Sequence, residues 1–333
     1  MKFLVIKKWQ GLLSLLLVFF IVMLVVSPDI YMESCLKGIA LWGNSVLPAL
    51  FPFFFFSSIL IKLGMLEKIG KFLSKFMQKF FHCPGSSGVI YLLSIISGYP
   101  VGAKITSELY ANGALSKNQV VRINAFASTS GPLFIVGSVG LGMFVNQTCG
   151  IIMLISHILG ALLNGLLYRN YKYKEEKAKS LDTYCLNDHT QEILSKTMYD
   201  SVMSILIVGG YIVIFNIVID MLFNVGFLQF LGSVFGVILN FLGLSPSLGT
   251  GVAGGILEVT RGCLDLASSG ADLKIITVLG CMLISWGGFS IHFQALTFLS
   301  KCKISVPFYF LQKFTHSLIS GVLCLACVFL FGI

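Results

Sequence analysis

Charged side chains are scarce in this sequence. Only 11% of its 333 residues are Asp, Glu, Lys or Arg, whereas 56% are hydrophobic. Ordinary soluble domains carry about 25% charged residues, and several apolar runs here approach the roughly 20 residues that a helix needs to cross a bilayer. The composition therefore excludes a soluble domain and indicates a multi-pass membrane protein.

Acidic residues are few, 14 against 23 basic ones, which gives a net charge of +9. Such a charge suits nucleic-acid binding, but the lysines and arginines stand in short segments between apolar runs. That placement is typical of cytoplasmic loops in membrane proteins. We therefore expect a small solute and the lipid bilayer as partners, and no nucleic acid. A homo-oligomer is left open.

Patterns for catalysis or for a bound cofactor are missing. The nine cysteines have no spacing typical of a zinc site or a disulfide framework. Paired carboxylates, a phosphate-binding loop and a nucleophile elbow are absent from the sequence. We predict that the protein is not an enzyme and holds no cofactor or metal.

Hydropathy predicts seven membrane spans. The first is an apolar run over 12–26, which lacks the cleavage pattern of a signal peptide. The other six are expected near residues 38–61, 123–145, 148–168, 201–223, 273–298 and 306–331. The apolar segment 226–242 is either an interfacial helix or an eighth span.

Two further stretches, 86–110 and 247–268, differ from these spans. Each is rich in glycine and other small residues and contains charged side chains. A broken helix at membrane depth is tolerated only where protein or a water-filled cavity covers it. We predict that both stretches are re-entrant hairpins.

The basic residues agree with this topology. With the N-terminus in the cytoplasm, seven crossings place most of them inside, including Lys301, Lys303 and Lys313 near the last span. Outside loops keep only Lys37 and Lys274, as the positive-inside rule expects.

Glycine spacing indicates an internal repeat. Intervals of 15 and 18 residues occur twice, in Gly98, Gly113 and Gly131 and again in Gly255, Gly270 and Gly288. Each copy contains three crossings, an odd number, so the second copy must be inverted. Inverted repeats with paired broken segments are typical of secondary transporters.

The predicted fold is an all-α polytopic membrane protein with about seven spans and two hairpins in an inverted repeat. Its parts are an N-terminal helix and external loop (1–37), a first repeat (38–168), a cytoplasmic linker (169–200) and a second repeat (201–333).

Several motifs resemble those of a known family. They are "SGYPVGAKITSELYANGALS" from Ser97, "STSGPLFIVGSVGLGMF" from Ser128, "GGILEVTRG" from Gly254 and "SWGGFSIHFQ" from Ser285. They resemble the YlbJ-like sporulation integral membrane proteins of the nucleoside-recognition (Gate) group, which is similar to concentrative nucleoside transporters.

The resemblance implies a role in endospore formation, in the mother-cell-derived membrane around the developing spore. For the family it also implies movement of dipicolinic acid, a small anion, into the spore. A nucleoside-type solute transporter and a non-transporting scaffold for the spore envelope are the alternatives.

Lys104 and Arg261 are the candidate anion ligands, because charged groups at membrane depth are costly and therefore indicate function. The alternative is internal ion pairing, of Lys104 with Glu108 and of Arg261 with Glu258 or Asp265. We expect the two basic groups to approach one midplane site from opposite hairpins.

The remaining candidates are polar residues of the hairpin tips and broken segments. Those expected to bind substrate are Gly98, Tyr99, Ser128, Thr129, Ser130, Glu258, Thr260, Ser285, Ser290 and Gln294. Those expected to bind a coupling cation or proton are Glu108, Glu258 and His292. Close helix packing is the alternative role of each serine.

Overall fold

The computed structural model describes residues 2–173 and 190–331. Much of the linker predicted at 169–200 therefore lies outside the described residues. All regular secondary structure within the described ranges is helical. This confirms the all-α class.

The first part of the chain, up to residue 168, forms eight α-helices and two π-helical segments. In order they are α1 (Lys2–Val26), α2 (Pro28–Leu41), η1 (Trp42–Val46), α3 (Leu47–Lys62), α4 (Met65–Phe81), α5 (Ser86–Ser97), α6 (Val101–Ala111), α7 (Lys117–Asn124), η2 (Leu133–Met143) and α8 (Gln147–Tyr168).

The part from residue 190 onward is built from similar helices. In order they are α9 (Thr190–Asn224), α10 (Phe227–Phe241), α11 (Leu248–Leu257), α12 (Val259–Ala267), α13 (Leu273–Trp286), α14 (Gly288–Leu299), the short η4 (Ser300–Cys302) and α15 (Val306–Phe331).

Among the described residues, four helical stretches are long and apolar enough to cross a membrane: Gln147–Tyr168, Ile193–Asn224, Leu273–Cys302 and Val306–Phe331. Two bent pairs, one joining α1 to α2 and one joining α4 to α5, raise the number to six if each pair forms one span. A multi-pass membrane protein is confirmed, whereas the predicted count of seven spans is not. At 15 residues, α10 is too short to be an eighth span.

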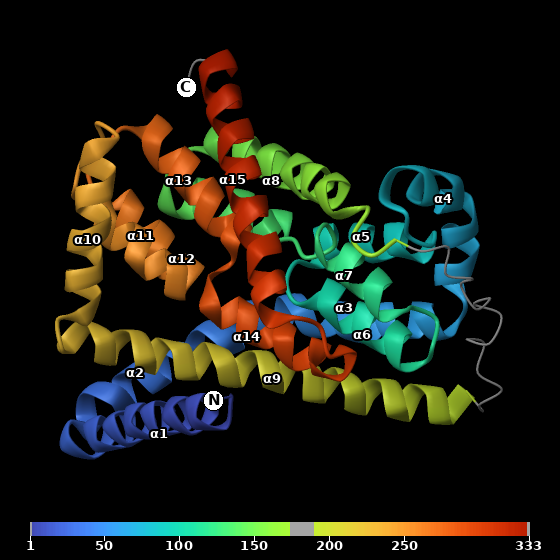
Figure 1. The fold of residues 1–333 in the computed structure, drawn as a ribbon, viewed down its shortest axis with the longest axis horizontal. Coiled ribbons are helices and arrows are strands. Elements are labelled where there is room, and N and C mark those ends of the chain that lie inside the picture. Colours follow the sequence, from blue (N-terminus) through green and yellow to red (C-terminus); the bar gives the residue numbers. More distant parts are fainter. Residues whose placement is uncertain (1, 174–189, 332–333) are drawn as a thin grey trace.

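The element order of the first half recurs in the second. The paired elements are α3 and α9, α4 and α10, α5–α6 and α11–α12, α7–η2 and α13–α14, and α8 and α15. In Figure 1, α4 and α10 lie at opposite ends of the long axis. That placement is expected of an inverted repeat.

The halves contact each other through equivalent elements. The long helices α3 and α9 pack together, as do the closing helices α8 and α15. The second arm of each hairpin also reaches the broken helix of the other half, α6 against α14 and α12 against η2. The two broken helices are therefore covered by protein, as membrane depth requires.

Glycine allows the arms of the second hairpin to pack closely. Gly255 on α11 faces Gly262 on α12, and Gly251 faces Leu266, so the two arms run antiparallel. A Cβ added to Gly262 would lie 2.2 Å from the Cα of Gly255. The stretch predicted at 247–268 is thus a tight helical hairpin.

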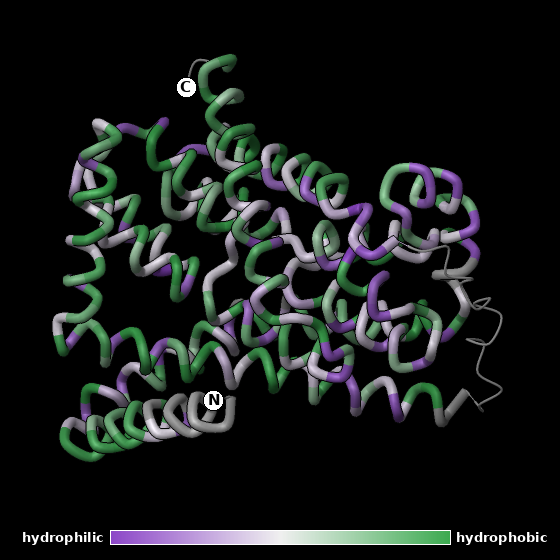
Figure 2. The backbone as a smooth tube through the Cα atoms, viewed as in Figure 1, coloured by the Kyte–Doolittle hydropathy of each residue, from purple (hydrophilic) through white to green (hydrophobic). Residues whose placement is uncertain are grey.

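Apolar side chains cover the outside of the molecule. Figure 2 shows hydrophobic residues along α10 and the C-terminal part of α15. On α4, Leu73 and Met77 pack against Gly88 of α5, while Phe72 and Phe76 are exposed. Exposed aromatic side chains on an amphipathic helix are typical of a helix that lies in the membrane interface.

We predict that Gly262→Ala destabilises the protein by about 1–3 kcal/mol or more, because the new Cβ meets backbone that cannot rotate away. The unfolding midpoint in detergent measures this. The matched control is Gly210→Ala on α9, where nothing lies within 4 Å of the added atom. The control is expected to be neutral or slightly stabilising, and an equal response of both variants would contradict the close packing.

We further predict that both hairpins are re-entrant. In a cysteine-free background, Ser245→Cys and Ser268→Cys stand at exposed ends of the second hairpin, and Lys79→Cys and Asn112→Cys are exposed beside the first. An impermeant thiol reagent should label the first pair from one side of the membrane and the second pair from the other. Division of either pair between the two sides would make that hairpin a full span.

Candidate functional site

Each hairpin tip packs against the break in the broken helix of its own half. Gly98 at the first tip has a φ of +82°, and a Cβ placed there would lie 2.9 Å from the amide nitrogen of Gly131. At the second tip, Leu257 and Glu258 meet Gly288, whose φ is +74°. Only glycine permits both the backbone conformation and the approach, so the breaks meet backbone to backbone.

A buried lysine of α15 joins the first tip to the first break. The Lys313 ammonium donates to the Tyr99 hydroxyl at 3.0 Å and to the Ser128 carbonyl at 2.8 Å. The Ser128 hydroxyl lies 3.4 Å away, and the side chain is buried. Among the described residues, no carboxylate lies within 4.0 Å of this ammonium.

The placement of Lys313 among the cytoplasmic basic residues was wrong. Its position eight residues into α15 resembles that of a loop-flanking lysine in a hydropathy profile. In the structure its side chain turns inward to the helix breaks instead of outward to water. The remaining basic residues, rather than Lys313, support the orientation, and the cytoplasmic N-terminus stays a prediction.

His157 of α8 ties the first break to α13. Its Nε2 accepts a hydrogen bond from the Ser130 amide at 2.9 Å, and its Nδ1 pairs with the Ser285 hydroxyl at 2.8 Å. In a neutral imidazole that accepts through Nε2, Nδ1 carries the proton and donates it to Ser285. The two candidate serines, one from each half, are therefore linked through one ring.

Other candidate residues form hydrogen bonds within their own half of the protein. The Thr129 hydroxyl pairs with that of Ser94 on α5 at 3.0 Å. On α14, the Gln294 amide donates to the Ser290 hydroxyl at 3.4 Å. His292 Nδ1 lies 3.3 Å from the Tyr309 hydroxyl, while its Nε2 is buried without a hydrogen-bond partner.

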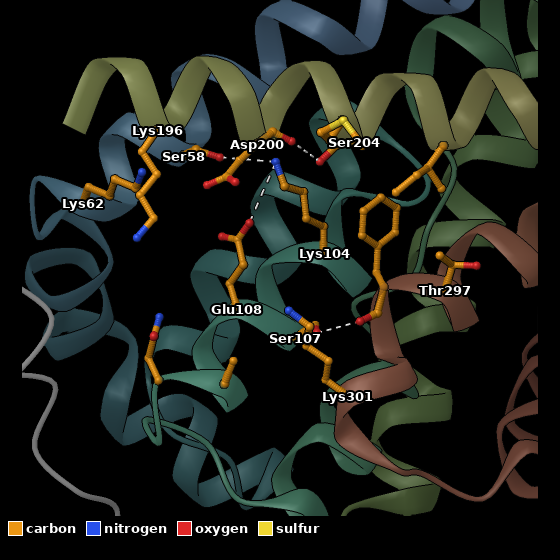
Figure 3. Close-up of a pocket in the computed structure, with 15 residues that line it drawn as sticks. Ser58, Lys62, Lys104, Ser107, Glu108, Lys196, Asp200, Ser204, Thr297 and Lys301 are labelled. Atoms are coloured by element: carbon orange, nitrogen blue, oxygen red, sulfur yellow. Dashed lines mark hydrogen bonds and ion pairs between the residues drawn. The ribbon is translucent and has the colours of Figure 1, made fainter. Parts of the chain in front are cut away.

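A cavity of about 640 Å³ opens beside α6, between α3, α9 and α14. Its charged lining residues are Lys62, Lys104, Lys196, Lys301, Glu108 and Asp200. Four ammonium groups thus face two carboxylates (Figure 3). Among the residues that the structure describes, basic side chains of the lining thus outnumber acidic ones, which suits an anionic ligand.

Lys104 is the most buried of these lysines. Its ammonium lies 3.4 Å from the Ser58 hydroxyl and 3.8 Å from the Glu108 carboxylate. Dashed lines mark both contacts in Figure 3. It also lies 4.8 Å from the centre of the buried Phe54 ring. The ion pair expected as the alternative is present, yet both of its members also line the cavity.

The second hairpin holds its candidate residues differently. The Glu258 carboxylate caps α12 by accepting from the amides of Thr260 and Arg261 at 3.0 and 2.8 Å. The Arg261 side chain is 42% exposed and lies 3.4 Å from Asp265. Of the two partners expected for Arg261, Asp265 therefore forms the ion pair with the guanidinium, whereas Glu258 accepts hydrogen bonds from backbone amides.

The expected convergence of Lys104 and Arg261 at one site is not found. Lys104 shares its cavity with Asp200, whereas the Arg261 guanidinium lies 6.0 Å from the ring of Phe223. Asp200 and Phe223 are both on α9, 23 residues apart, which corresponds to about 35 Å along a helix.

The two ion pairs occupy equivalent positions in the repeat instead. Lys104 and Arg261 are separated by 157 residues, as are Glu108 and Asp265 and the glycines that revealed the repeat. The pairs differ in exposure: the side chain of Lys104 is 5% exposed and that of Arg261 is 42% exposed. Equivalent residues of the two halves thus experience different surroundings in one structure.

Sequence reasoning missed Lys313 as a central residue and most of the cavity lining. A lysine within a 26-residue apolar helix was the available signal for Lys313. Ser58, the α9 residues Lys196 and Asp200, and Lys301 come from three elements whose contact no local pattern indicated.

Comparisons with known proteins agree with the motifs. Residues 44–144 match the Gate family, described as "Nucleoside recognition". The chain is also 29% identical over 313 residues to the sporulation integral membrane protein YlbJ of Bacillus subtilis (strain 168), covering 89% of this chain and 77% of the relative. No solved structure gives a significant match. The resemblance inferred from the hairpin motifs is confirmed.

We predict that His157→Leu destabilises the protein, because the Ser130 amide and the Ser285 hydroxyl lose their partner without a large change in volume. Each buried group left unsatisfied costs about 1–3 kcal/mol. The neighbouring Ser156→Ala is the matched control, since its buried hydroxyl has no hydrogen-bond partner. Denaturation in detergent should separate the two variants, and equal stability would show that the His157 contacts contribute little.

Proposed function

We propose that this protein moves a small organic anion across a membrane during endospore formation, with dipicolinate as the candidate substrate. The observation that carries the proposal is the charge of the cavity beside α6, four lysines against two carboxylates. The sporulation context comes from the name of the relative, and dipicolinate comes from the family resemblance.

The size and chemistry of the cavity suit such a ligand. Its volume of about 640 Å³ falls within the range of about 300–1,000 Å³ that is usual for small-molecule sites. Lysine binds carboxylates as a point charge with rotatable donors, so several lysines can follow a planar dicarboxylate as it moves. Lys104 is the deepest of these groups and has the strongest reason to hold an anion, because little water reaches its ammonium.

The repeat supplies a second basic residue for the other end of the path. Arg261 is the equivalent of Lys104 in the second half and lies near the far end of α9. We propose that the anion meets Lys104 on one side of the membrane and Arg261 on the other, in turn rather than together. Broken helices between these ends provide the small, protein-covered gates that alternating access uses.

Transport is proposed in preference to catalysis because the cavity offers charge and hydrogen-bond donors around an open volume. A nucleoside-type solute is the second candidate, favoured by the description of the Gate family that matches 44–144. A neutral nucleoside has no charge for the lysines to balance. A scaffold that transports nothing would need neither the cavity nor its lysines.

Uptake of labelled dipicolinate by purified protein in lipid vesicles tests the proposal. Lys104→Gln and Arg261→Gln should each lower uptake by roughly 10–100-fold, the equivalent of one charge-assisted hydrogen bond. Arg261→Lys should restore part of it, because the charge returns without the bidentate geometry. Lys79→Gln is the control, since Lys79 is exposed near the end of α4 and does not line the cavity.

Parallel uptake of labelled uridine separates the candidates. Uridine uptake without dipicolinate uptake would favour the nucleoside candidate, and uptake of neither by protein that remains folded would favour the scaffold. Normal dipicolinate uptake by both Gln variants would show that Lys104 and Arg261 are structural and would overturn the proposed path.

A further inference from the structure

Lys313 occupies a place that transporters of broken-helix design commonly give to a free cation. In such proteins, carbonyl groups released where helices unwind coordinate a coupling Na⁺ ion. Here α7 ends at Asn124 and η2 begins at Leu133, and the Ser128 carbonyl lies in the unwound stretch between them. That carbonyl accepts a hydrogen bond from the Lys313 ammonium at 2.8 Å.

The seat of this ammonium is made of oxygen atoms from two unwound segments. The Ser128 carbonyl and hydroxyl come from the broken helix, and the Tyr99 hydroxyl comes from the tip of the first hairpin. Hydroxyl and carbonyl oxygens are the ligands that hard cations prefer. These oxygens are neutral and do not compensate the positive charge of the ammonium. A coupling ion in the same seat would likewise stay uncompensated until the anion binds.

Burial of the Lys313 ammonium costs hydration free energy. An ammonium taken out of water without a paired carboxylate loses several kcal/mol of hydration, and no carboxylate within the described ranges lies within 4.0 Å of it. A methionine or leucine at the same place on α15 would pack without that cost. The seat is therefore arranged around a positive charge.

We propose that the Lys313 ammonium is a tethered cation that fills the coupling-ion seat between the first hairpin tip and the first helix break, so that the protein works without free Na⁺. It clamps Tyr99 to Ser128 as a bound ion would, but it cannot leave with the substrate. This inference deepens the proposed transport function. Only its uptake measurement depends on that function, because the unfolding measurements need no substrate.

Thermal unfolding of the purified protein in detergent tests the seat without any substrate. The wild-type midpoint should be the same in sodium chloride and in choline chloride at equal ionic strength. Lys313→Ala empties the seat and keeps its oxygens, so this variant should unfold at lower temperature in choline and gain a few degrees in sodium, by preferential binding to the folded state. Lys313→Met, whose side chain fills the same space, should be insensitive to sodium.

Lys274→Ala is the matched control, because Lys274 is exposed at the start of α13; it should respond to neither salt. The proposal would be overturned if sodium raised the unfolding temperature of the wild type. It would also be overturned if sodium failed to raise the unfolding temperature of Lys313→Ala. Should Lys313→Ala not accumulate, the wild-type comparison still decides, together with Tyr99→Phe. Tyr99→Phe removes one oxygen, leaves the ammonium seated and should remain insensitive to sodium; a sodium response there would also count against it.

Dipicolinate uptake by wild-type vesicles gives the second readout. Uptake should be unchanged when choline replaces sodium on both sides of the membrane. Uptake that falls at least tenfold without sodium would overturn the tethered-cation proposal while leaving anion transport intact. Lack of uptake in either salt would count against the proposed function, and the unfolding measurements would then decide on the seat alone.

Discussion

A helix that breaks inside a bilayer leaves backbone amides and carbonyls that water cannot reach, and the rest of this structure depends on satisfying them. Breaks occur at both hairpin tips and in both broken helices. Gly98 packs on Gly131 in the first half, and Gly288 packs on Leu257 and Glu258 in the second. Because these contacts join backbone to backbone, they fix where the polar groups lie and which helices must surround them.

The two halves satisfy the same constraint with opposite charges. In the first half a cation from a distant helix, Lys313, donates a hydrogen bond to the freed carbonyl of Ser128. In the second half a carboxylate, Glu258, accepts the free amides at the start of α12. Each choice follows from the polarity of the peptide group, since carbonyls favour cations and amides favour anions. The inverted repeat is therefore symmetric in its helices and asymmetric in its charges.

These differences explain what the sequence could and could not predict. Hairpins and helix breaks leave local signals, such as "SGYP" and "STSGP", and the glycine intervals predict a repeat whose order of elements recurs in the two halves of the structure. The only signal for the burial of Lys313 was its place inside an apolar helix, and under the positive-inside rule a lysine near the end of a span is interpreted as a loop residue. The cavity beside α6 depends on four separate elements. The expected meeting of Lys104 and Arg261 treated these equivalent residues as neighbours, whereas the structure places them beside opposite parts of α9.

That separation bears directly on how a charged solute can cross. If Lys104 and Arg261 lay together, an anion between them would be held by both and released slowly to either side. On the proposed anion path, the roughly 35 Å of α9 between their surroundings lets each group bind and release the anion on its own side of the membrane. Lys104 is buried beside its cavity while Arg261 is half-exposed, so one structure shows equivalent groups in unequal states. In the proposed transport cycle, an exchange of those states between the halves would change the side of the membrane that the cavity faces, with each hairpin tip shifting against the helix break that it contacts.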